Sequence, residues 1–289
     1  MKKIWLLILA AVLMCGGFMG CSKQKDEGSD GGGTAAGCSG PKTDAIKCVG
    51  DIPTWDAHAK RDAVEPGSFA EYLRKLPLKP KGYPTHWYNG IEKANRTAAY
   101  RVVDMDIDSV DLQQCADACI RLYAEYLWNS KQYDKIKFHF VSGFLADYDR
   151  WAHGERIRVN GNHASWYRVN SHEDYSYKTF RDYLLMVFMY AGTASLPQDM
   201  EDVGPTPSIG DVIIQPGSPG HAVMVVDKAG ERFIVAQSYM PAQEIEILRN
   251  TEGTGCWTAV NGDKVFTPEW RFDLSRTAKI MRFKDSAVQ

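Results

Sequence analysis

The chain has 289 residues, of which 24% are charged, and a formal net charge of −2. A slightly acidic chain without a basic stripe lacks the electrostatic attraction that nucleic-acid binding requires, so we expect no nucleic-acid partner. The length suits one large domain or two small ones. We find no internal repeat at solenoid spacing and no second linker, which favours one domain.

Residues 1–21 have the pattern of a lipoprotein export signal. Two lysines precede an apolar run over 4–14, and small residues lead up to Cys21. The run is shorter than the roughly 20 residues of a membrane-spanning helix. Gly20 before Cys21 is typical of a lipobox, in which the cysteine is diacylated, and two acyl chains hold a protein stably on a membrane. Phe18 is unusual in a lipobox, which leaves a plain signal peptide as the alternative.

The rest of the chain divides into a tether and a folded part. Residues 22–44 are rich in Gly, Ser, Lys and acidic residues and contain almost no large apolar residue, which is the composition of a flexible tether. Ser22, directly after the anchor, is compatible with sorting to the outer membrane. We therefore expect a lipid-anchored protein of the cell envelope, with a single domain over 45–289.

Helical patterns come first in this domain, and strand patterns dominate its end. The predicted elements, in chain order, are a helix from Ser68 to Pro77, a strand over 99–107, the clearest helix over 109–128, a strand over 135–143, a long loop or insertion over 146–176, a buried helix over 177–196, and strands over 210–215, 221–227, 232–239, 244–248 and 278–283. This order predicts an α+β fold, with an antiparallel sheet packed against an N-terminal helical layer.

Cys115 is the candidate nucleophile. In "SVDLQQCADAC" Asp111 is the predicted N-cap and Gln114 completes a capping box, which places Cys115 at the end of the first helical turn. The positive end of the helix dipole favours the thiolate there, and thiolate is the nucleophilic form of cysteine. Cys119 lies one turn deeper and feels less of that field.

Other interpretations of these thiols stay open. Five cysteines follow the anchor, and an odd number leaves at least one thiol free or intermolecular; they are Cys38, Cys48, Cys115, Cys119 and Cys256. Spacing excludes a Cys115–Cys119 bond, because side chains at i and i+4 are about 5–6 Å apart at Cβ. Pairing of either with Cys256 would end the catalytic hypothesis. Both are otherwise ordinary small hydrophobes on a buried helix face.

A metal site is a further alternative. Cys115, Cys119 and His221 would supply three ligands, but two cysteines at i and i+4 within a helix are not a usual zinc-binding spacing. We therefore expect no metal and no cofactor.

His221 is the candidate base. It opens the apolar strand in "GDVIIQPGSPGHAVMVVD", and a histidine at a strand start with a cysteine at a helix start are the two halves of a cysteine-hydrolase site. Gln237 on the next strand is the candidate that orients the imidazole. With a three-residue loop over 229–231, Gln237 shares the face of His221; with a loop of two or four residues, Ser238 takes that face instead. We favour the three-residue loop, because Gly230 suits a bulged turn.

The "GDVIIQPGSPGHAVMVVD" stretch resembles a segment of the NlpC-like and CHAP papain-fold peptidases and amidases. In those families the histidine opens a strand, a polar residue follows on the next strand, and the nucleophile opens a helix, which matches Cys115. The resemblance implies a papain-like fold. This sequence departs from the families' usual Asp-Cys-Ser-Gly or Asn-Cys in having Gln114 before the cysteine and Ala116 after it.

A second resemblance covers nearly all of the domain. "PGSFAEYLRKLPLKP", "DLQQCADACIRLYAEYL", "YAGTASL" and "AQSYMPAQE" are similar to an uncharacterised family of bacterial lipoproteins that carry a domain of unknown function. This resemblance implies no chemistry.

Two functions are therefore expected to compete. The first is a cysteine hydrolase that cleaves peptide or amide bonds, with cell-wall peptide as its substrate, in which the backbone N–H of Cys115 and Gln114 face the oxyanion. The second is a papain-like surface lipoprotein without catalysis, which binds glycan or a protein partner through the aromatic residues of 146–176.

Overall fold

The structure is a computed structural model and describes residues 44–284. These residues belong to one compact unit, Thr43–Gln289. The predicted signal peptide, the lipidation site Cys21, Cys38 and almost all of the predicted tether lie outside the described residues. No helix within 44–284 is long and apolar enough to cross a membrane.

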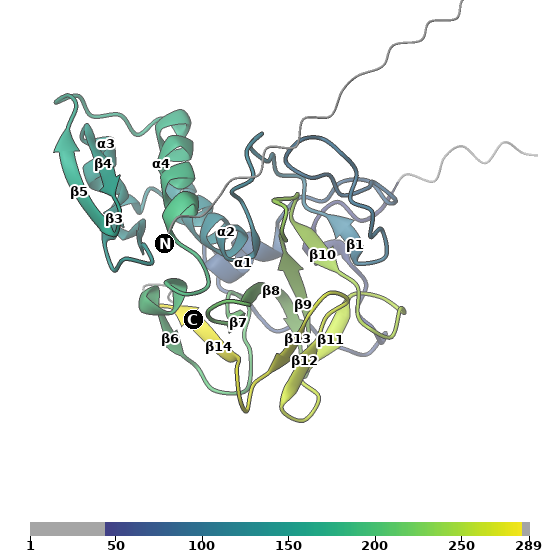
Figure 1. Cartoon of the computed structure of the whole chain (residues 1–289). Helices are drawn as coiled ribbons and strands as arrows, with labels where there is room; N and C mark the ends of the chain where they lie inside the picture. Colours follow the sequence, from purple (N-terminus) through teal and green to yellow (C-terminus); the bar gives the residue numbers. More distant parts are fainter. Residues whose placement is uncertain (1–43, 285–289) are drawn as a thin grey trace, which may run out of the picture. The chain divides into compact units, whose positions relative to one another are not determined.

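The fold is α+β, and its largest sheet is antiparallel throughout (Figure 1). In spatial order its strands are β1 (Ala99–Val102), β10 (Glu246–Leu248), β9 (Arg232–Gln237), β8 (His221–Ala229), β7 (Val212–Gln215), β14 (Lys279–Phe283) and β6 (Met200–Asp202), while β11 (Trp257–Ala259) also pairs with β9. The strands predicted in the C-terminal part are therefore present, and β8 and β9 form the predicted hairpin at the centre of the sheet.

Helices form where the sequence supplies an N-cap or a long apolar face. They are α1 (Phe69–Arg74), α2 (Cys115–Asn129), α3 (Tyr148–Ala152) and α4 (Tyr177–Tyr190), with short 3-10 turns η1 (Val49–Asp51), η2 (Tyr133–Lys135) and η3 (Leu196–Asp199). Ser68 is the predicted N-cap of α1, and its hydroxyl accepts the N–H of Glu71 at 3.1 Å. Both α1 and α2 pack against β8, so helices cover one face of the sheet.

The segment predicted as a loop or an insertion over 146–176 contains regular secondary structure, which contradicts the loop. It contains α3 and a hairpin of β4 (Glu155–Asn160) and β5 (His163–Arg168), which lies beside α3 and α4 in Figure 1. Two more strand pairs lie outside the main sheet, β2 (Lys137–His139) with β3 (Leu145–Asp147) and β12 (Lys264–Phe266) with β13 (Arg271–Asp273).

The prediction for 146–176 was wrong because this hairpin lacks the alternation of a half-buried strand. Only Ile157 of β4 is buried. Backbone pairing along β4 and β5 forms the hairpin, and cation–π contacts add to it. The guanidinium of Arg158 lies 4.7 Å from the centre of the Tyr167 ring, and that of Arg150 lies 4.6 Å from the centre of the Trp166 ring. Most of the aromatic residues that gave the segment its unusual composition therefore fix its structure.

The core lies on both faces of the central hairpin. Alternate residues of β8 and β9, such as Met224 and Ala236, face a large cluster that includes α1, α2 and α4. The opposite set, such as Val223 and Val235, faces a smaller cluster completed by the β12–β13 pair. Because both faces are buried, the register of β8 against β9 decides which side each side chain occupies.

The predicted three-residue loop between these strands is wrong. Ala229 pairs with Arg232, so the loop is Gly230–Glu231, and Gly230 has a φ of +58°, which suits glycine at the first position of a two-residue hairpin turn. Farther along, however, the register shifts between Val225 and Asp227. Val226 is the extra residue of this β-bulge, and the bulge restores the pairing that a three-residue loop would have produced.

The bulge is held by a buried ion-pair cluster. Asp227 is fully buried, and its carboxylate accepts from Arg61 Nε at 2.6 Å and Arg74 Nε at 2.8 Å. The same carboxylate accepts the N–H of Lys228 at 2.9 Å. Without the bulge, Asp227 would point to the opposite, apolar face, so the charge pairing and the extra residue support each other.

Replacing Asp227 with Ala is expected to lower the free energy of unfolding by about 3 kcal/mol, because two partly buried guanidinium groups lose their partner. Urea unfolding of the full-length chain measures this. The control is Asp182→Ala, which removes an exposed carboxylate 2.7 Å from Lys178 and should cost less than about 0.5 kcal/mol. Equal losses for the two variants would contradict the role given to Asp227.

Candidate active site

Cys115 is the first residue of α2. Gln114 precedes it with extended backbone angles, and the N–H of Gln114 donates to the carboxylate of Asp117 at 3.0 Å. The predicted N-cap, Asp111, is therefore wrong, because its carboxylate instead accepts the N–H of Ala242 at 2.6 Å. The helix begins three residues later than predicted, which moves Cys115 closer to the positive end of the dipole.

Opposing effects act on the Cys115 thiol. Burial raises its pKa, the N–H of Ala222 pointing at the sulfur lowers it, and the carboxyl of Asp117 raises it again. The helix N-terminus adds a further lowering effect. The expected lowering of the Cys115 pKa is thus not met, and the surroundings of the thiol do not deprotonate it on their own.

Cys119 is more deeply buried than Cys115 and does not line the pocket of Cys115. It is 1% exposed, its Sγ donates to the carbonyl oxygen of Cys115 at 3.5 Å, and burial raises its pKa well above the ordinary value. Cys48, Cys115, Cys119 and Cys256 are all free thiols. Cys256 therefore does not block either helix thiol, and burial raises its own pKa to about 12.

His221 opens β8, as predicted, and is 2% exposed. Its Nε2 lies 2.8 Å from Oε1 of Gln237. Its ring lies between aromatic side chains, with centroid distances of 5.0 Å to both Tyr239 and Trp270. The bulge described above makes this pairing possible, since it places His221 and Gln237 on the same face of the hairpin.

The amide of Gln237 is oriented by Glu269. Its Nε2 donates to Oε2 of Glu269 at 2.7 Å, which turns Oε1 towards the imidazole. An amide oxygen only accepts hydrogen bonds, so Nε2 of His221 carries a proton. Burial lowers the pKa of His221 to about 4, so the ring is neutral at pH 7 and its Nδ1 keeps its lone pair. The pairing thus fixes a neutral tautomer whose free nitrogen points away from Gln237.

Sequence reasoning missed Glu269 and its partner Lys93. The carboxylate of Glu269 accepts from Nζ of Lys93 at 2.7 Å, and the same ammonium donates to Glu246 at 2.9 Å. Glu269 lies outside the strands, and Lys93 lies in an irregular segment more than a hundred residues away. No periodicity or motif connects them, so only the fold could have revealed this chain of contacts.

Cys115 and His221 line the same pocket, which has a volume of about 460 Å³. Other walls come from the residues that follow α4 (191–193), from the loop 217–220 and from 239–240. Gln237 is not among the residues that line the pocket. Within 44–284 there is no hydrogen bond between Cys115 Sγ and the His221 ring. The sulfur instead has backbone N–H groups as polar neighbours, chiefly that of Ala222 and also those of Ala116 and Cys115.

The loop before His221 is tightly packed against the opposite wall. A Cβ at Gly220 would lie 2.3 Å from the carbonyl oxygen of Gly217 and 2.4 Å from Oγ1 of Thr193. The Thr193 hydroxyl also donates to that same carbonyl at 3.0 Å. Only glycine fits immediately before His221, and this contact fixes where the chain enters β8.

Hydrogen-bond donors are available beside the sulfur. The first four N–H groups of a helix have no partner within the helix, and Cys115 contributes the first of them. Gln114, the second predicted oxyanion donor, also lines the pocket. Its Nε2 lies 3.5 Å from Oδ1 of Asp111, which is a weak contact that a substrate would replace at little cost.

The zinc alternative gains no support. Within 44–284 no three His, Cys, Asp or Glu residues are grouped so that they could hold a metal ion. Cys115, Cys119 and His221 therefore do not form a ligand set in the described part of the chain.

The profile of one protein family matches residues 54–279, a range that includes Cys115, His221, Gln237 and Glu269. Its description is "Domain of unknown function (4846)". The chain belongs to this family. No curated protein and no solved structure matches the chain. Since the family description names no activity, the function has to be argued from the geometry of the site.

Because His221 is buried in its neutral form, the stability of the protein is expected to depend on pH. Burial lowers the pKa of His221 from 6.5 to about 4, so the folded protein resists the proton that the unfolded chain accepts. The stability contributed by neutral His221 is fully present above pH 6.5 and is lost as the pH falls towards 4, where the folded imidazole also protonates. We expect this component to be about 3 kcal/mol.

Urea unfolding at pH 7 and pH 4.5 checks this expectation. His221→Asn should flatten the decrease in stability between the two pH values, whereas His163→Asn, which removes an exposed histidine of β5, should leave it unchanged. If His221→Asn kept the full pH dependence of the parent chain, the buried neutral imidazole would be disproved.

Proposed function

We propose that this protein is a papain-like cysteine hydrolase of the cell envelope that cleaves amide bonds. The observation that carries the proposal is that Cys115 and His221 line one pocket while Gln237 and Glu269 hold the imidazole in the tautomer a base requires. A helix that begins at the thiol and packs against the strand that begins at the histidine is also the arrangement of papain-like enzymes.

The proposed reaction starts from neutral partners. Nδ1 of His221 takes the proton of the Cys115 thiol as Sγ attacks the carbonyl carbon, and the imidazolium then gives that proton to the leaving amine. Water attacks the resulting thioester, its proton passing through His221 to the departing sulfur, and the acid is released. The N–H of Cys115 and the Gln114 amide would donate to the oxyanion.

A neutral resting pair is what the electrostatics favour. Burial raises the pKa of Cys115 and lowers the pKa of His221 to about 4, so burial opposes the ion pair. Proton transfer is then expected only when a bound substrate brings the thiol and the imidazole together and excludes water, since apo geometries are often looser than reacting ones.

The substrate we propose is a peptide of the cell wall. The lipid anchor at Cys21, which lies outside the described residues, would place the domain at the envelope, with the outer membrane as its attachment site. Peptide cross-links are the amide substrate of that compartment, and this part of the proposal rests on analogy.

Two observations favour a second function, a papain-like binding protein without catalysis. No hydrogen bond joins Cys115 to His221 among the described residues, and the β4–β5 hairpin presents Tyr167, 40% exposed, to solvent. A glycan or a protein partner would stack on this ring. Of the other aromatic residues predicted for such a surface, Trp151 is 5% exposed and belongs to the core instead.

The test uses purified peptidoglycan and the full-length chain, and it measures the release of free amines. Cys115→Ala and His221→Ala should each lower the rate by about 10³-fold or more, the effect typical of a nucleophile–base pair. Gln237→Ala should lower the rate by about 10²-fold, because the tautomer is no longer fixed.

Cys48→Ala is the matched control, because it removes a partly exposed free thiol that does not line the pocket. It should keep full activity. If the parent chain released no amine, or if Cys115→Ala were as active as the parent, the hydrolase would be rejected. Retained binding of glycan or peptide by Cys115→Ala, lost on Tyr167→Ala, would then support the second function.

A further inference from the structure

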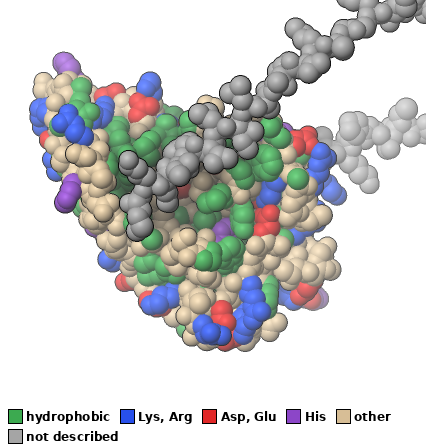
Figure 2. All heavy atoms as spheres, viewed as in Figure 1, with side chains coloured by type: hydrophobic (Ala, Val, Ile, Leu, Met, Phe, Trp, Pro, Cys, Tyr) green, Lys and Arg blue, Asp and Glu red, His purple; other side chains and the backbone are tan. Residues whose placement is uncertain are grey.

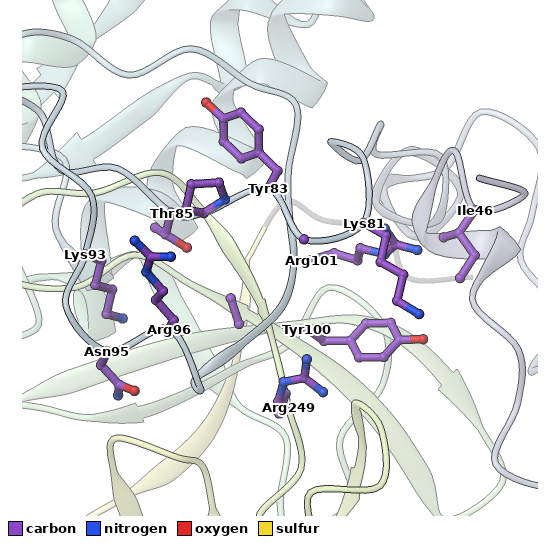
Figure 3. A pocket seen from close by; sticks show the side chains of 13 residues that line it. Ile46, Lys81, Tyr83, Thr85, Lys93, Asn95, Arg96, Tyr100, Arg101 and Arg249 are labelled. Atoms are coloured by element: carbon purple, nitrogen blue, oxygen red, sulfur yellow. The ribbon is translucent and has the colours of Figure 1, made fainter. Parts of the chain in front are cut away.

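A second cavity lies apart from the candidate active site, and the proposed hydrolase reaction does not use it. Its volume is about 430 Å³, and its lining comes from Ile46, from segments within 81–101 and from Arg249, which follows β10. Figure 3 shows its side chains. It shares no lining residue with the pocket of Cys115 and His221.

The charged side chains that line the cavity are all basic. Five basic side chains line it and no carboxylate does; in the view of Figure 3, Lys93 and Arg96 lie on one side and Lys81 and Arg101 on the other, with Arg249 between them. On the face of the molecule drawn in Figure 2, by contrast, basic and acidic side chains are interspersed. The charged residues that line the cavity are therefore of one sign, whereas those of the visible surface are mixed.

Three of these cations already have partners. Arg101 donates to both carboxylate oxygens of Asp44, at 2.7 and 3.0 Å. Arg96 pairs with Glu92 at the exposed rim. Lys93 is held between Glu246 and Glu269. These pairs shape the wall and leave little of their charge for a ligand.

Lys81 and Arg249 differ from the others. Within 44–284 neither side chain has a carboxylate partner, and the guanidinium of Arg249 lies 5.7 Å from the ring of Tyr100. Arg249 is a partly buried residue that lines the cavity, and no carboxylate within 44–284 pairs with its side chain. A guanidinium without an acidic partner can bind an anion, and its planar fork fits carboxylate and phosphate.

We propose that this cavity binds a small organic anion, whose carboxylate or phosphate group is held by Arg249 and Lys81. The apolar part of the ligand would contact the walls made by Ile46, Tyr100 and Pro84. None of these residues lines the pocket of Cys115 and His221, so the two sites can be tested separately.

Lys93 decides which variants are suitable. It lines the cavity, but its ammonium also donates to Glu269, which orients Gln237. Replacing Lys93 would disturb both sites, so the test uses Arg249→Ala and Lys81→Ala. Lys81 is exposed, and its loss should not affect folding. The control is Arg158→Ala, which removes an arginine that also stacks on a tyrosine but lies outside the cavity.

Isothermal titration of the full-length chain with inorganic phosphate and with succinate, at constant ionic strength, tests the proposal. We expect saturable one-site binding of at least one probe, weakened at least tenfold, or about 1.4 kcal/mol, by each cavity variant and unchanged in Arg158→Ala. Tighter binding of phosphate identifies a phosphoryl ligand, and tighter binding of succinate identifies a carboxylate.

Two results would overturn the proposal. The first is that neither probe saturates a site in the parent chain. The second is that Lys81→Ala binds as tightly as the parent, because Lys81 is one of the two cations assigned to the anion. Anion binding is measured without peptidoglycan, so a failure to hydrolyse peptidoglycan changes neither result. The anion site and the hydrolase can therefore be disproved independently.

Discussion

The bulge at Val226 is the constraint on which the candidate site depends. A two-residue turn alone would pair β8 and β9 so that Ser238, not Gln237, lies on the face of His221. One extra residue reverses that outcome for the half of the hairpin beyond it. Asp227 stabilises the bulge from the helix side, because its buried carboxylate needs the guanidinium groups of Arg61 and Arg74. A charge cluster in the scaffold thus determines a contact between two polar side chains several residues away.

The electrostatics of the site follow from its burial. Aromatic rings around His221 keep the imidazole neutral, and the Gln237 amide, oriented by Glu269, decides which nitrogen carries the proton. The thiol is also held neutral by its surroundings, although the helix N-terminus and the N–H of Ala222 act in the other direction. In the proposed hydrolase, such a site would react only when a ligand changes its geometry, which differs from enzymes that hold a thiolate at rest.

Sequence patterns predicted the parts of this structure that are local. Apolar periodicity predicted α2, α4 and the strands of the central hairpin, and the α+β order of elements is confirmed. The N-cap of α2 was misplaced because Asp111 satisfies a backbone N–H of a distant loop instead of the helix, a tertiary effect. The predicted length of the loop between β8 and β9 was wrong. The bulge at Val226 cancelled the resulting error in register, and no residue preference in the sequence predicted that bulge. Glu269 and Lys93 could not be predicted, since their contacts join segments far apart in the chain.

Gly220 has a consequence for how relatives of this chain should be recognised. Its missing side chain lets the loop before β8 pass within contact distance of Thr193, so the glycine before His221 has a steric cause that does not depend on the histidine. The glycine would be retained even in a protein that had lost the histidine, because it preserves the wall. A homologue with glycine but no histidine would therefore share the architecture and lack the chemistry, whereas one with any larger residue at that position must have rebuilt the pocket.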